Sequence, residues 1–151
     1  DGEYNLAFHP VTTVGMGFEK PATTASLIVA QKAPEQWTAF HQALFAYFYE
    51  RFTASDGTVI QDAAKSLDQV KVIAKGVGVP QDVIDTFTED SVDAYLATTT
   101  AAWQKAGFSG RDPSSFGTPE VVVDNTVVNF KALDAQTVMS AIHSALGAAS
   151  K

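Results

Sequence analysis

The chain has 151 residues, enough for one domain with a buried core, and its 46% hydrophobic and 18% charged residues are typical of a globular protein. Its formal net charge is −7 and it has no run of basic residues, which argues against a nucleic-acid partner. No apolar stretch approaches the roughly 18–20 residues that a membrane-spanning helix needs. The absence of cysteine excludes disulfides, thiolate metal sites and cysteine nucleophiles from these residues.

Hydrophobic periodicity and turn signals predict, in chain order, a strand, a block of four or five helices, a β-hairpin and a terminal helix. The strand is expected at residues 4–8, where Tyr4, Leu6 and Phe8 alternate on one face. The expected helices cover residues 22–32, 34–52, 67–75, 80–88, 90–107 and 135–146, and the hairpin strands cover 120–123 and 126–130. This order indicates either an α+β fold or a βα core that carries an all-helical insertion.

Several helix ends have local signals. Pro34 stands at a plausible first helical position, and Ser66 with Gln69 forms a capping box for the helix that ends at Gly76. Asp134 is the expected N-cap of the last helix. We therefore expect these boundaries to be set locally.

Two apolar stripes are expected to face a core. The first lies on the helix at 34–52, and its members are Trp37, Phe40, His41, Leu44, Phe45, Phe48 and Phe52, with Tyr47 and Tyr49 at its border reaching water. The second lies on the last helix and consists of Val138, Met139, Ile142 and Leu146. Both patterns are more typical of core packing than of a ligand site.

Pro119 stands immediately before a run of valines, in the segment "SSFGTPEVVVDN". Proline is confined to the starts, edges or bulges of strands, and an X-Pro bond is the common place for a cis peptide. A cis bond after Thr118 would present a short backbone edge that could accept an extended peptide by strand addition. The alternative is a proline that only ends a loop. Downstream, Asp124-Asn125 is a strong two-residue hairpin signal.

The segment "FGTPEVVVDNTVV", followed by a capped helix, resembles the cis-proline loop, hairpin and last helix of the thioredoxin superfamily. Upstream, "NLAFHPV", "ATTASLIVAQKAPEQWTAFHQALF" and "AYLATTTAAWQKAGFSG" are similar to the bacterial DsbA-like thiol–disulfide oxidoreductases, in particular to exported actinobacterial forms. The resemblance implies an α/β, thioredoxin-like single domain over 1–151. In it, a DsbA-type helical insertion covers about 22–107, and the hairpin and C-terminal helix cover about 118–148.

The resemblance also implies a site. Pro119 matches the family's cis-proline, Thr118 matches the residue that contacts the substrate backbone, and Gly117 completes the expected substrate-binding segment. His41 matches a structural histidine of the helical insertion. The implied partners are extended peptides or cysteine-containing proteins, in an extracytoplasmic compartment. No catalytic residue, cofactor or metal ligand is expected in this chain.

The family's first strand and its helix with the Cys-x-x-Cys motif would precede Asp1, so they are absent from this sequence. In the family this central strand lies between the strands that match residues 4–8 and 120–123. Without it, backbone groups on both of these strands would be unpaired, at roughly 1–3 kcal/mol for each buried group. Three explanations stay open. In the first, which we favour because the chain does not begin with Met, the missing segment and any export signal or anchor belong to a longer natural protein. In the second, a second copy exchanges a strand. In the third, the β elements pair differently.

Two functional hypotheses follow. In the first, the chain is the larger part of a DsbA-like oxidoreductase whose cysteines lie upstream, because thiol–disulfide exchange needs a thiolate. In the second, it is a redox-inactive thioredoxin-like module that binds peptides or proteins. A metal enzyme is disfavoured, because His9, His41 and His143 lie on different elements and lack zinc-like spacing. The carboxylate pairs at 82/85 and 89/90 are interpreted as helix N-terminal charges rather than as an acid–base site.

Overall fold

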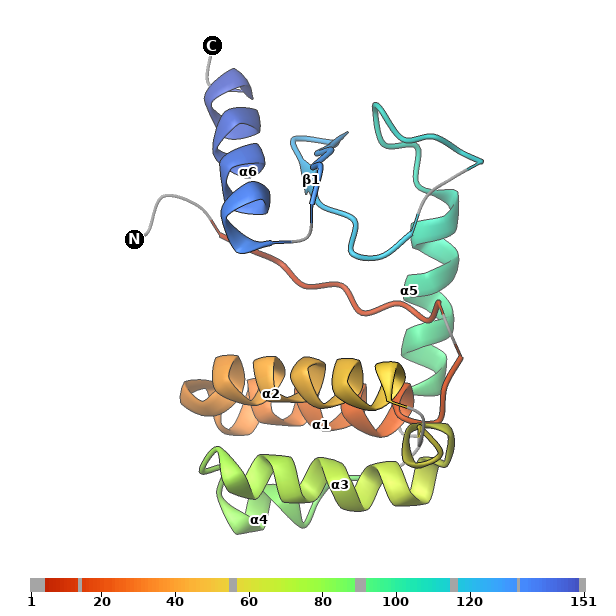
Figure 1. Ribbon diagram of the computed structural model, residues 1–151, viewed down its shortest axis with the longest axis vertical. Coiled ribbons are helices and arrows are strands. Elements are labelled where there is room, and N and C mark those ends of the chain that lie inside the picture. Colours follow the sequence, from red (N-terminus) through yellow and green to blue (C-terminus); the bar gives the residue numbers. More distant parts are fainter. Residues whose placement is uncertain are drawn as a thin grey trace. The chain divides into compact units, whose positions relative to one another are not determined.

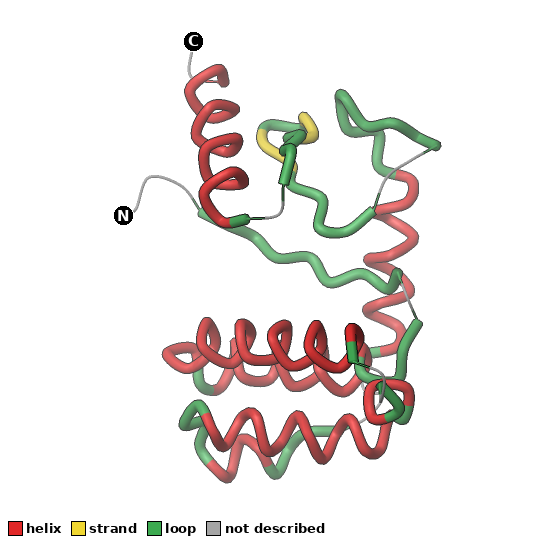
Figure 2. The backbone as a smooth tube through the Cα atoms, in the orientation of Figure 1, coloured by secondary structure: helices red, strands yellow, loops and turns green. Residues whose placement is uncertain are grey.

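The structure is a computed structural model that describes residues 5–13, 15–54, 57–88, 92–114, 117–132 and 134–149. Within these residues it is mostly helical, with six α-helices and one small antiparallel hairpin (Figures 1 and 2). The combination of a helical block with a hairpin is confirmed, whereas the larger thioredoxin-like sheet stays a prediction. The chain divides into two compact units, Asp1–Ala101 and Ala102–Lys151.

The first unit is a helical bundle. Its elements are α1 (Glu19–Lys32), α2 (Pro34–Thr53), the 3-10 helix η1 (Val59–Gln61), α3 (Ala63–Gly76), α4 (Gln81–Ile84) and the start of α5 (Asp93–Lys105). Helices α1, α2 and α3 pack against one another, and α4 packs on α1 and α3 (Figure 1). Their buried faces form one hydrophobic core that includes Val29, Phe40, Ile60 and Val70.

The aromatic stripe of α2 is only partly in this core. Phe40 and Leu44 are buried, and the ring of Phe40 stacks on Phe87 at a centroid distance of 6.1 Å. The prediction that Phe45 and Phe52 belong to the core is wrong, because their exposed fractions are 64% and 53%. The buried residues Phe40 and Leu44 are one helical turn apart and therefore share one face of α2, whereas Phe45 and Phe52 lie outside that face. Tyr49 is also exposed, as expected.

The start of α3 differs from the predicted capping box. The helix begins at Ala63, and Asp62 is its N-cap, because the Asp62 carboxylate accepts a hydrogen bond of 3.0 Å from the amide of Lys65. Ser66 is fully buried in the helix, where its hydroxyl donates to the carbonyl oxygen of Val59 at 2.9 Å. The end at Gly76 and the position of Pro34 in the first turn of α2 are confirmed.

The strand expected at 4–8 is absent from its described part, residues 5–8, which form neither helix nor strand (Figure 2); Tyr4 lies outside the described residues. No described strand pairs with this segment, and the ring of Phe8 instead lies edge-on to the rings of Trp37 and His41 in α2, at centroid distances of 5.2 Å and 5.1 Å. The residues that follow it bind α5. Thr99 donates its hydroxyl to the carbonyl of Pro10 at 2.7 Å, and the amide of Thr12 donates to the hydroxyl of Thr100 at 2.9 Å. Leu6 and Phe8 are half or more exposed, unlike residues of a strand face packed on a core.

The second unit contains the end of α5, the hairpin strands β1 (Val122–Val123) and β2 (Thr126–Val127), and α6 (Ala135–Ala149). Helix α6 packs against β1, and Ile142 is its buried contact residue. Asp134 caps α6 as predicted, accepting from the amide of Thr137 at 2.9 Å. Met139 is 39% exposed, so its predicted inward position is wrong.

None of the helices in the described part of the chain is both long and apolar enough to cross a membrane.

Candidate functional site

The hairpin of the second unit has one edge that another segment covers and one edge with which no described residue pairs. Its register pairs Val122 with Val127 and Val123 with Thr126, around a turn in which Asp124 and Asn125 have φ values of 51° and 61°. Two positive φ values are typical of a type I′ turn, and the two-residue hairpin that the Asp-Asn pair predicted is confirmed. The amide of Val128 donates to the carbonyl of Val121 at 2.8 Å and extends the pairing by one step.

Ser109 covers the outer edge of β2. The amide of Val127 donates to the carbonyl of Ser109, and the amide of Ser109 donates to the carbonyl of Asn125, both at 2.9 Å. In an antiparallel ladder, alternate residues direct their backbone groups away from the partner strand, so Val122 directs its amide and carbonyl to the opposite edge. Among the described residues, the backbone of Val122 has no hydrogen-bond partner at that edge.

The predicted substrate-binding residues precede this edge directly in the chain. Gly117, Thr118 and Pro119 are exposed, and the bond between Thr118 and Pro119 is cis, as the sequence led us to expect. Gly117 and Pro119 line a hollow of about 210 Å³ at the foot of the hairpin. Its other lining residues come from two segments, 110–112 and 120–121, and from the residues 127–130 that follow the turn. Thr118 is not part of its lining.

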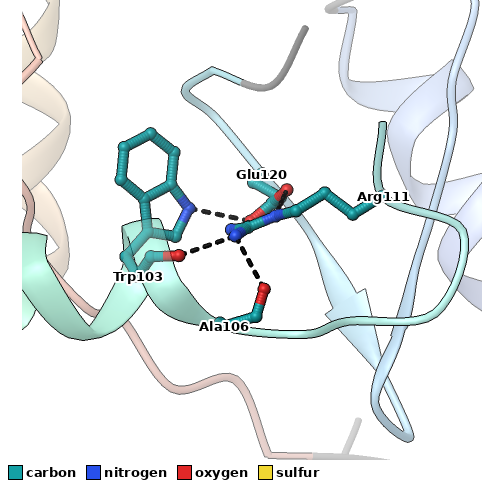
Figure 3. Close-up of polar contacts among 4 residues, drawn as sticks. All are labelled: Trp103, Ala106, Arg111 and Glu120. Atoms are coloured by element: carbon teal, nitrogen blue, oxygen red, sulfur yellow. Dashed lines mark hydrogen bonds and ion pairs between the residues drawn. The ribbon is translucent and has the colours of Figure 1, made fainter. Parts of the chain in front are cut away.

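A buried ion pair holds the segment that follows Pro119. The carboxylate of Glu120 accepts from Nε of Arg111 at 2.9 Å and from the second arm of the same guanidinium, and it also accepts from Nε1 of Trp103 at 2.8 Å (Figure 3). Nη1 of Arg111 donates to the carbonyls of Trp103 at 2.6 Å and Ala106 at 3.0 Å. The guanidinium also lies 4.9 Å from the ring centroid of Phe108, within cation–π range.

These contacts shift the pKa values of both charged groups. The hydrogen bond from Arg111 lowers the pKa of Glu120 below its ordinary value, against the opposing effect of burial, and the hydrogen bond from Trp103 lowers it further. The hydrogen bond to Glu120 raises the pKa of Arg111. The pair is therefore ionised at neutral pH, and the exposed fractions of its two side chains are only 6% and 8%.

Sequence reasoning missed this pair. The sequence places Trp103 in the expected helix at 90–107 and Glu120 at the start of the expected strand at 120–123, with Arg111 between these two elements. The available signal was a lone arginine and a lone carboxylate on either side of a loop rich in Gly, Pro and Ser, which does not by itself predict a contact. Only the folding back of the chain after α5 brings the three side chains together.

The histidines do not form a second site. His9 and His143 are exposed, and His41 lies in a small network in which Nε1 of Trp37 donates to the hydroxyl of Ser26 at 3.1 Å. The Ser26 hydroxyl lies 3.4 Å from Nδ1 of His41, and burial lowers the pKa of this histidine. In the described ranges, no group of three or more potential ligands is arranged to hold a metal ion.

Comparison of the chain with protein-family models, with curated proteins and with solved structures gave no match. A functional assignment therefore depends on the residues and geometry described above.

Proposed function

We propose that this chain is the helical and peptide-binding part of a DsbA-like thiol–disulfide oxidoreductase, and that its substrates bind as extended segments beside Gly117, Thr118 and Pro119. The redox cysteines of this proposal lie on a further segment of the natural polypeptide, because disulfide exchange needs a thiolate and these residues contain none. The substrates are cysteine-containing proteins of an extracytoplasmic compartment. The order of the quoted family motifs along the chain supports this assignment.

The single observation that carries the proposal is the exposed segment formed by Gly117, Thr118 and Pro119, two of which line a hollow of about 210 Å³. The resemblance places the upstream strand at the edge of β1, so the expected position of a substrate is the segment that precedes β1. An extended peptide can pair with the backbone of such a segment, as in strand addition, which is a common mode of peptide recognition. Backbone pairing also suits a protein that must accept many substrates, because it does not depend on one substrate sequence.

The second candidate is a thioredoxin-like module that binds peptides without redox chemistry. The absence of cysteine from all 151 residues favours it. Both candidates use the same segment, residues 117–119, and differ only in whether a reactive sulfur lies near the bound peptide. We prefer the first because the resemblance covers nearly the whole chain in the family's order.

Binding is tested with a fluorescein-labelled octapeptide of alternating valine and threonine, with lysine at each end for solubility, measured by fluorescence anisotropy. Gly117→Leu places a large side chain at the hollow without a clash inside the protein, since a Cβ atom at Gly117 would have no neighbour within 4 Å. We expect the octapeptide to bind roughly tenfold more weakly, because the leucine side chain occupies space that the peptide needs. Gly117→Ala adds only one methyl group at the same position, and it is the matched control.

Unchanged binding by Gly117→Leu, with the hairpin intact by amide NMR spectra, would refute peptide binding at this segment. The redox part is tested separately on the complete gene product. Its free thiols are counted and its ability to reoxidise reduced ribonuclease is measured. Catalysed reoxidation supports the oxidoreductase, whereas peptide binding by a gene product without a reactive cysteine pair supports the second candidate.

A further inference from the structure

We propose that the hollow beside Gly117 and Pro119 is a specificity pocket: it takes one long cationic side chain of the bound peptide, a lysine or an arginine, and Asp112 supplies the opposite charge. This inference rests on the proposed function, because it names the substrate side chain that the same segment receives. It does not depend on the edge of β1.

The hollow adjoins the β2 side of the hairpin rather than the β1 edge. Its lining includes residues 110–112 and 127–130. Ser109, which directly precedes the first of these segments, pairs with the outer edge of β2. Neither Val122 nor Val123, the two residues of β1, is part of the lining. A strand that pairs with β1 therefore leaves the hollow accessible to a peptide.

The size of the hollow suits a single side chain. Its volume is about 210 Å³, whereas pockets that hold drug-sized ligands typically measure about 300–1,000 Å³. Successive side chains of an extended peptide point to opposite sides, so a peptide that lies along Gly117 and Pro119 directs every second side chain to the same side. One such side chain can enter the hollow.

Three charged side chains line the hollow, and two of them neutralise each other. Arg111 and Glu120 form the buried ion pair, and the guanidinium nitrogens are engaged by Glu120 and by two carbonyls at the end of α5 (Figure 3). Asp112 is exposed and forms no ion pair with a described residue, so its negative charge is uncompensated at the hollow. Lys131, the next cation along the chain, is not part of the lining.

The carboxylate of Asp112 is held in place by its own loop. Its Oδ1 accepts hydrogen bonds from the hydroxyl of Ser114 at 2.7 Å and from the amide of Ser114 at 2.8 Å. The bond from the hydroxyl, followed by the bond from the amide, lowers the pKa of Asp112, so the group is ionised at neutral pH. Among the described residues, the other oxygen accepts no hydrogen bond. A charge that is already fixed loses less conformational freedom when a ligand binds it.

The rest of the lining suits the aliphatic part of a long cationic side chain. Val121, Val127 and Phe130 are half-buried, and Val128 is buried. Lysine and arginine pack their methylene stems on apolar surface while their charged heads stay in contact with water. A purely apolar side chain would contact the same valines but leave the carboxylate without a partner, and an acidic side chain would be repelled. Lysine and arginine therefore match both parts of the lining.

The central experiment compares three fluorescein-labelled octapeptides by fluorescence anisotropy. They share the valine–threonine sequence, with serine in place of the terminal lysines, and differ in one central residue: lysine, its uncharged analogue norleucine, or glutamate. Because an exposed ion pair is a modest interaction, we expect the lysine peptide to bind roughly threefold to fivefold more tightly than the norleucine peptide, and the glutamate peptide to bind most weakly. Salt at about 1 M should remove most of the difference. Equal affinities of the lysine and norleucine peptides at low salt would overturn the proposal.

Asp112→Asn identifies the opposite charge. The asparagine side chain can still accept both hydrogen bonds from Ser114, so the loop is kept while the charge is lost. We expect the preference for lysine over norleucine to disappear, and the norleucine peptide to bind as it does to the wild type. Asp124→Asn is the matched control, because it removes the same charge from the hairpin turn, outside the hollow, and asparagine tolerates the positive φ of that position. A lysine preference that survives in Asp112→Asn, or that both variants lose equally, would refute the role of Asp112.

A second readout separates this inference from the proposed function. The ions n-butylammonium, which matches the end of a lysine side chain, and n-butyrate are titrated into the wild type and Asp112→Asn. Amide NMR shifts are followed at Gly110, Gly117 and Asn129 in the lining, with Gly147 in α6 as the reference. We expect butylammonium to shift the lining amides of the wild type only, and butyrate to shift none.

The two failures are then distinguishable. If peptides bind without a lysine preference, this inference fails and the proposed function stands. If no peptide binds the wild type, the proposed function fails. The cation pocket is in that case supported by butylammonium shifts at the lining and refuted by their absence.

Discussion

Gly17 offers a sharp test of the packing in the first unit. A Cβ atom built on Gly17 would lie 2.6 Å from the carbonyl oxygen of Gln61, 2.7 Å from its carbonyl carbon and 2.8 Å from the amide nitrogen of Ala63. All three neighbours are backbone atoms, so no side chain can rotate away. The adjacent amide of Phe18 also donates to the carbonyl of Ile60 at 2.9 Å, which holds the two segments together. Gly17→Ala therefore forces them apart.

The cost of this substitution can be estimated from two opposing effects. Inserting a methyl group into a closely packed position typically costs about 1–3 kcal/mol. Replacing glycine by alanine restricts the unfolded chain, which returns about 0.4–1 kcal/mol. The net expectation is a loss of about 1–2 kcal/mol in the free energy of unfolding. For a unit of this size, that loss lowers the melting temperature by roughly 5–15 °C.

The measurement is urea unfolding of the full chain, followed by circular dichroism at 222 nm. Gly76→Ala is the matched control: no atom lies within 4 Å of its added Cβ, and Gly76 ends α3 with an ordinary negative φ. We expect the control to be neutral or slightly stabilising. A Gly17→Ala variant as stable as Gly76→Ala would show that the contact between residues 17 and 61 is not part of the folded state.

Three further predictions concern burial and charge. Ser66→Ala should lower the free energy of unfolding by about 1–2 kcal/mol, because the carbonyl of Val59 loses its donor; an unchanged urea midpoint would contradict this. Phe40→Ala should cost about 3–5 kcal/mol and Phe45→Ala less than about 1 kcal/mol in the same assay, and equal losses would place Phe45 in the core. Because the folded pKa of Glu120 lies below the ordinary value of 4.5 for a glutamate, its stabilisation is complete above that pH and is lost as the pH falls below it. Melting temperatures measured from pH 7 to pH 3 should therefore fall further for the wild type than for Glu120→Gln, and parallel curves would refute the assignment.

Local signals in the sequence predicted several features of the fold correctly. The Asp124-Asn125 turn, the Asp134 cap and the proline in the first turn of α2 each depend on a few consecutive residues, so their outcome depends little on the rest of the chain. The Ser66 cap was wrong because Asp62 offered a competing cap four residues earlier. Packing against η1 then decided between them, by burying Ser66 against the Val59 carbonyl.

The strand at 4–8 and the core position of Phe45 needed information that the local pattern does not contain. An alternating segment becomes a strand only when another strand pairs with it, and here no described strand does so, while the ring of Phe8 packs against Trp37 and His41. Likewise, an apolar stripe on a helix can be wider than the face that its neighbours cover. Phe45 is exposed for that reason.

By itself, the sequence determined the helical content, the hairpin with its turn, the absence of thiol chemistry from these residues, and the position of Gly117, Thr118 and Pro119 next to a strand. Only the tertiary structure decided that Ser109 covers the β2 edge while no described residue pairs with the β1 edge, and that Arg111 pairs with Glu120. Turns and caps are made by immediate neighbours in the chain. Strand edges and ion pairs are made by residues on different segments, which meet only when the chain folds back on itself.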